Sequence, residues 1–196
     1  MKIIDLYQIS NAYTVLSKKT VTNIQAAITI ASYHKPLRDA LDSVDTIRRG
    51  IIARFPAENK RSVDDQQNLI KDINEFMNGD IEVILPSTKV KRESLGDISL
   101  GVIPFVYLSG VLIEGERVAP YSEKTAHLIP LFMKEIPITS RLFNVGMQIF
   151  LAGSIDNIGP WLSEEDLKVL PNVSPTELVE LLPLVVTEEP NKGDDT

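Results

Sequence analysis

The sequence predicts a mainly α-helical fold, a helical bundle or hairpin with one small β hairpin. Apolar residues recur at spacings of three and four in successive segments, as they do on one face of a helix. Capping residues, glycine and proline stand where these segments begin and end. The period changes at residues 81–85, a short β-branched run bounded by Gly79 and Pro86. The 196 residues are 43% hydrophobic and 24% charged, which is the composition of a globular protein with a core.

The chain is expected to begin with two helices. Asp5 is predicted to cap the first, with Gln8 as its capping-box partner, and Lys19 lies at its C-terminal end, where cations suit the helix dipole. Thr22 is predicted to begin the second helix. Pro36 then marks either a break or the first turn of a new helix, because proline disfavours helix in the residue before it.

Residues 37–78 resemble an antiparallel helical hairpin. An apolar stripe runs from Leu37 to Phe55, and the polar stretch 56–62 follows as a loop. Ser62 is predicted to cap the second arm, which ends near Gly79. Because neither arm hides its apolar face alone, both are expected to pack on each other and on the first two helices.

Residues 81–93 are predicted to form the β hairpin. The run 81–85 is the first strand, and the lysine-rich stretch 89–94 returns as an edge strand. Two strands alone are only marginally stable, so this hairpin is expected to lean on helices or on another chain.

The back half of the chain is expected to be helical again. Helices are predicted over 97–113 and 122–136, and the segment 140–152 is apolar on nearly every side. Short helices are predicted after the capping residues Ser163 and Ser174.

Three regions are therefore expected along the chain. Residues 1–80 form an N-terminal helical hairpin region. Residues 81–187 hold the β hairpin and the apolar helices, packed with the first region. Residues 188–196 are polar and acidic, and are predicted to be a flexible tail.

The sequence predicts no catalytic, cofactor-binding or metal-binding residue. It has no cysteine and two histidines, His34 and His127, and it lacks phosphate-binding glycine loops. The densest acidic clusters, at 64–65 and 164–166, follow serine caps, and the helix dipole accounts for acids there.

The net charge of −7 is unevenly distributed. Ten of the 27 acidic residues but two of the 20 Lys and Arg residues lie in 151–196. This acidic end disfavours nucleic-acid binding, and the compact basic run of Lys89, Lys91 and Arg92 has no aromatic residues beside it to stack on bases. The longest apolar stretch, 100–113, is too short to span a bilayer, and no secretory signal is evident. The protein is expected in the cytosol of its host cell or inside a particle, with no membrane partner.

The apolar segments 100–113 and 140–152 have two interpretations, a buried core or a subunit interface. Aromatic and methionine side chains are enriched in interface cores, and the single tryptophan follows a Gly-Pro pair in a predicted loop. The residues predicted to contact a protein partner are Phe105, Tyr107, Phe143, Met147, Phe150 and Trp161.

Residues 1–113 resemble small proteins encoded by tailed bacteriophages. The resemblance lies in IDLYQISNAYTVLSKK at the start of a helix, a long polar-faced hairpin, NGDIEVILP, and then GDISLGVIPFVYLSGVLIEG. It covers somewhat more than half of the chain, and it implies a virion component or an assembly factor rather than an enzyme.

The leading functional interpretation is a non-enzymatic protein that binds a protein partner, either other copies of itself or a larger phage component. Burial of apolar surface would hold this structural or assembly subunit in place. A second interpretation is a soluble inhibitor or regulator that docks on a host protein through its acidic surface. An enzyme of unrecognised type is the third interpretation.

Overall fold

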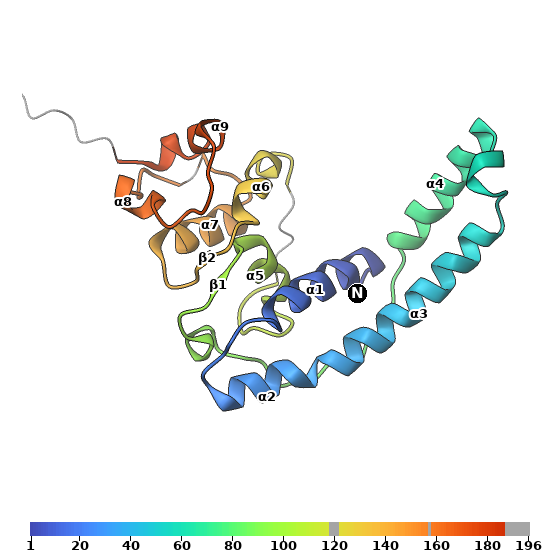
Figure 1. The fold of residues 1–196 in the computed structure, drawn as a ribbon, viewed down its shortest axis with the longest axis horizontal. Coiled ribbons are helices and arrows are strands. Elements are labelled where there is room, and N and C mark those ends of the chain that lie inside the picture. The colour runs from blue at the N-terminus through green and yellow to red at the C-terminus, as the bar shows by residue number, and fades with distance from the viewer. Residues whose placement is uncertain (118–121, 157, 187–196) are drawn as a thin grey trace, which may run out of the picture. The chain divides into compact units, whose positions relative to one another are not determined.

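A computed structural model describes residues 1–117, 122–156 and 158–186 (Figure 1). The fold is mainly helical with one small two-stranded antiparallel sheet, which confirms the predicted fold class. The described chain divides into two compact units. The N-terminal unit comprises Met1–Gly96 and Val111–Glu114, and the C-terminal unit comprises the remainder. The first boundary between the units falls at Gly96, and the expected tail at 188–196 lies outside the described residues.

Four helices build the N-terminal unit: α1 (Ile3–Leu16), α2 (Ile24–Ser32), α3 (His34–Ala53) and α4 (Val63–Met77). A short 3-10 turn, η1 (Glu58–Lys60), lies between α3 and α4. Helix α1 packs against both α3 and α4, and its apolar side chains form the centre of the core. The buried residues of α1 are Ile3, Leu6, Ile9, Ser10, Ala12, Tyr13 and Leu16.

The predicted hairpin is present as α3 and α4. Figure 1 shows α3 following α2 closely and α4 returning beside the far end of α3. Pro36 lies in the first turn of α3, where its missing N–H costs nothing. Ser62 caps α4 and forms a capping box with Asp65.

Two of the predicted caps were wrong. Helix α1 begins at Ile3, before Asp5, which lies in its first turn. Helix α2 is capped by Asn23, whose side chain accepts a hydrogen bond from the Ala26 N–H, rather than by Thr22. Both residues lie within a residue or two of the true ends, which is the usual uncertainty of such boundaries.

The predicted β hairpin at 81–93 is absent from the described structure. Residues 81–85 have no strand beside them, and the chain from 92 to 95 forms a 3-10 turn, η2 (Arg92–Leu95). Instead of returning along 81–85, Val90 pairs with the segment 111–114 through an isolated parallel bridge to Ile113. The Val90 N–H donates to the Leu112 carbonyl and the Val90 carbonyl accepts from the Glu114 N–H, so the pairing that residue 90 makes joins it to a segment more than 20 residues further along the chain.

The sheet lies in the C-terminal unit, where β1 (Ser99–Leu100) pairs with β2 (Ile136–Pro137). A helix had been predicted to start at residue 97, so this part of the prediction was wrong. Gly101 explains the difference, since a Cβ there would lie 2.7 Å from the Met133 carbonyl oxygen. The backbone therefore approaches its neighbour closely before α5 (Val102–Leu108) begins.

The rest of the C-terminal unit consists of short helices around one longer helix. The predicted helix at 122–136 is shorter than expected and comprises η3 (Ala126–Leu128) and α6 (Ile129–Phe132). The apolar segment 140–152 forms α7 (Arg141–Ala152) as predicted, capped by Ser140. The remaining helices are α8 (Glu164–Leu167), α9 (Pro175–Val179) and the 3-10 turn η4 (Leu182–Leu184).

Aromatic side chains fill the core of this unit. Phe105 of α5 meets Phe143 of α7 edge to face, with ring centroids 5.2 Å apart. Phe132 of α6 meets Phe150 in the same manner at 5.7 Å. Gly146 lets α7 approach this core, since a Cβ there would lie 2.6 Å from the Phe132 ring. Edge-to-face pairs of this kind add about 0.5–1.5 kcal/mol beyond the burial of their area.

Candidate protein–protein interface

Residues 81–85 have the side-chain pattern of a β strand although no strand lies beside them. Ile81, Val83 and Leu85 are half-buried, whereas Glu82 and Ile84 are exposed. Ile84 is the most exposed large apolar side chain in the described chain, at 84%. Burial that alternates with a period of two indicates an extended backbone whose side chains point to opposite faces. We call residues 81–85 the edge segment.

The backbone of the edge segment is paired only at its first residue. The Ile81 N–H donates to the Met1 carbonyl at 2.8 Å, and the Met1 ammonium donates to the Ile81 carbonyl at 3.0 Å. Within the described residues, the N–H and C=O groups from Glu82 to Leu85 form no hydrogen bond. A stretch of unpaired backbone in extended conformation is a template for another strand.

The chain beyond the edge segment is held by Tyr33, at the junction of α2 and α3. The Tyr33 hydroxyl lies 2.8 Å from the Pro86 carbonyl oxygen and 3.0 Å from those of Thr88 and Val111. Its single O–H proton is shared among these three acceptors. Tyr33 is fully buried, and burial raises the pKa of its hydroxyl. The Val90 N–H then donates to the Leu112 carbonyl at 2.8 Å. The edge segment is thus fixed at both ends and free in the middle.

A groove of about 480 Å³ lies between the edge segment and α3. Its helical wall carries Lys35 and Asp39, which form an ion pair at the surface, together with small side chains. An incoming side chain therefore meets apolar and small groups with one cation, Lys35, and two anions, Asp39 and Glu82, nearby. The residues that line the groove are Lys35, Pro36, Asp39, Ala40, Ser43 and Ile81–Ile84.

The helical hairpin also leaves apolar side chains uncovered. Ile47 of α3 and Val63 and Ile70 of α4 are each more than half exposed. Helix α4 has no fully buried residue, so it is held by half-buried contacts to α3 and α1. Ile24 and Ile28 of α2 are also more than half exposed, so the exposed apolar surface of the N-terminal unit is spread over the edge segment, the hairpin and α2.

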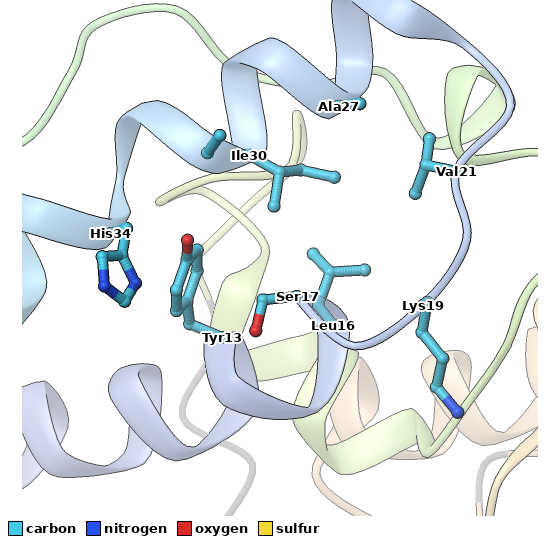
Figure 2. Close-up of a pocket in the computed structure, with 9 residues that line it drawn as sticks. Tyr13, Leu16, Ser17, Lys19, Val21, Ala27, Ile30 and His34 are labelled. Atoms are coloured by element: carbon cyan, nitrogen blue, oxygen red, sulfur yellow. The ribbon is translucent and has the colours of Figure 1, made fainter.

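A second cavity, of about 400 Å³, lies between the end of α1 and α2 (Figure 2). Leu16, Val21 and Ile30 line its apolar part, and Figure 2 shows the Tyr13 hydroxyl at its side next to His34. Tyr13 is 7% exposed, and burial raises its pKa, yet its hydroxyl has no hydrogen-bond partner in the described part of the chain. Tyr13 and Tyr33 therefore differ in their hydroxyl contacts, and this makes them a useful pair for mutation.

The predicted contact residues do not gather on one surface. Phe105, Phe143 and Phe150 are buried against other side chains of their own unit, whose core they help to form. Tyr107 and Met147 are half-buried, and Trp161 is 46% exposed. Partner contacts by these six residues stay a prediction.

The acidic clusters serve as helix caps. Asp65 accepts hydrogen bonds from the side chain and backbone of Ser62, and these bonds lower its pKa. Asp166 does the same with Ser163, whose backbone bond is the largest cause of its lowered pKa. Over the described residues, no three His, Cys, Asp or Glu side chains gather as a metal site would require.

The histidines and the basic run have ordinary surroundings. The His127 ring lies 3.4 Å from a Glu180 carboxylate oxygen, and the His34 ring lies beside Tyr13. Arg92 of the basic run is half-buried, and burial lowers its pKa. Among the helices of the described ranges, none is both long and apolar enough to cross a bilayer.

Sequence reasoning identified the edge segment as β-like but missed Tyr33, which fixes the chain beyond it. No local signal marks a tyrosine at a helix junction as a clamp, because its partners lie 53 to 78 residues away. Comparisons of the chain with protein-family models, curated proteins and solved structures found no match.

Proposed function

We propose that this chain is a protein–protein interaction subunit that takes a β strand from a partner at its edge segment. The observation that carries the proposal is the unpaired backbone of residues 82–85 beside an open groove. Main-chain hydrogen bonds would give such a contact its affinity, and the groove would receive alternate side chains of the incoming strand.

The exposure of Ile84 supports the same function. Ile84 combines an exposed apolar side chain with unpaired backbone groups in extended conformation. Natural proteins avoid this combination at strand edges that have no partner. The resemblance of residues 1–113 to small proteins of tailed phages supports the finer proposal that the subunit is a phage structural or assembly component, present in a virion or in the host cytoplasm.

Replacing Ile84 with proline tests the proposal. Proline removes the N–H at that position and so prevents a ladder bond. The folded chain should tolerate it, because the Ile84 N–H bonds to no described residue. Ile84→Thr is the matched control, since it also removes the apolar side chain but keeps the N–H and the β-branched shape.

The measurement is the mass of the complexes formed by each variant, alone and with extract of the host, by light scattering and mass spectrometry. We expect the parent and Ile84→Thr to form a complex that Ile84→Pro loses, with association weakened at least tenfold. Identical complexes for all three proteins would contradict the proposal, as would a parent chain that forms none.

A further inference from the structure

We propose that the partner strand comes from a second copy of this chain, paired antiparallel along the edge segment with Val83 at the centre. This inference rests on the proposed function and names its partner. The resulting dimer is symmetric, so each copy gives and receives the same strand.

The hydrogen bonds already present select the edge that is free. In an extended chain, successive residues direct their N–H and C=O groups to opposite edges. Met1 occupies the edge of Ile81, as the two backbone bonds between these residues show. The other edge carries the groups of Glu82 and Ile84, which have no partner in the described ranges.

An antiparallel copy centred on Val83 satisfies this free edge completely. Glu82 then lies opposite Ile84 of the second copy, and the two residues exchange both of their backbone bonds. The same exchange occurs at Ile84, because the arrangement is twofold symmetric. The backbone N–H and C=O groups of Glu82 and Ile84 in both copies are then all hydrogen-bonded. Val83 lies opposite Val83 of the second copy.

The side chains also fit this register. Ile81 faces Leu85 of the second copy, so the half-buried face of the two-stranded ribbon is apolar throughout. A parallel, in-register pair would instead set the two Glu82 carboxylates side by side, which is unfavourable. Glu82 is the only charged residue of the edge segment, and in the antiparallel register it lies opposite the apolar Ile84 rather than opposite the other Glu82.

Engineered cysteines test the register, because the chain contains no cysteine of its own. In the proposed dimer the two Val83 Cα atoms form a non-hydrogen-bonded pair about 4.5 Å apart. That separation is within the range of a disulfide, roughly 4.4–6.8 Å. Two copies of residue 81 would be separated by four residues along the ribbon, about 13 Å, which is too far.

Under mild oxidation, Val83→Cys is expected to form a disulfide-linked dimer at least ten times faster than Ile81→Cys. A mixture of Ile81→Cys and Leu85→Cys should cross-link well, since these positions face each other. Equal rates for all single variants would show random collisions and overturn the register.

A monomeric parent chain that binds a different protein, with that binding lost in Ile84→Pro, would overturn the self-pairing and leave the proposed function standing. A parent chain that forms neither a dimer nor any complex sensitive to Ile84→Pro would overturn both.

Discussion

Replacing Phe143 with alanine is expected to lower the free energy of unfolding of the C-terminal unit by about 3–5 kcal/mol. Phe143 is fully buried and meets Phe105 edge to face, so its removal leaves a cavity and ends an aromatic pair. Urea denaturation followed by tryptophan fluorescence measures the loss, because Trp161 is the only tryptophan and lies in the same unit.

Met147→Ala provides the comparison on the same helix. Met147 lies one turn beyond Phe143 but is half-buried, so its truncation should cost clearly less. A Phe143→Ala protein of unchanged stability and reduced mass in solution would contradict its place in the core, and would return this residue to an interface.

Replacing Tyr33 with phenylalanine is expected to cost about 1–3 kcal/mol in the N-terminal unit, because the buried carbonyl oxygens of Pro86, Thr88 and Val111 lose the one hydroxyl donor that they share. The ring stays buried, so packing is preserved and the loss reports the hydrogen bonds. Thermal or urea unfolding followed by far-ultraviolet circular dichroism measures it, since the N-terminal unit contains the long helices.

Tyr13→Phe is the matched control for this prediction. It removes the same hydroxyl from a tyrosine that is nearly as buried but has no hydrogen-bond partner in the described structure. Its effect should stay within about 0.5 kcal/mol. If the two variants lose equal stability, the Tyr33 hydroxyl does not hold the chain beyond the edge segment.

Local signals predicted the helices well. Ser62, Ser163 and Ser174 cap their helices as expected, each with an acid three residues later that completes a capping box. The arms of the hairpin and α7 were predicted because apolar periodicity and caps lie within the helix itself. Helix caps and apolar periodicity can be recognised from residues that are neighbours in the sequence.

Pairing between strands was not predictable in the same way. The edge segment has the period-two burial of a strand, but which chain lies beside it depends on residues far away in sequence. Val90 pairs with residues 111–114, and Ser99–Leu100 pairs with Ile136–Pro137, across 20 to 40 residues of intervening chain. Alternation alone cannot choose among such partners.

The surroundings of the predicted contact residues also depend on residues far away in sequence. A helix that is apolar on nearly every side fits equally well in a core or in a subunit interface. Phe105 and Phe143 are more than 35 residues apart in sequence, and only the fold shows that they cover each other. Ile84 of the edge segment, by contrast, is exposed because the described part of the chain supplies no strand beside it.

Amide hydrogen exchange at residues 82–85 tests the central claim most directly. If the edge segment pairs with a second copy, the Glu82 and Ile84 amides should exchange slowly at high protein concentration and quickly at high dilution. In the Ile84→Pro variant, Glu82 should exchange quickly at every concentration. Fast exchange of both amides in the parent chain at all concentrations, including those at which it associates, would contradict the account.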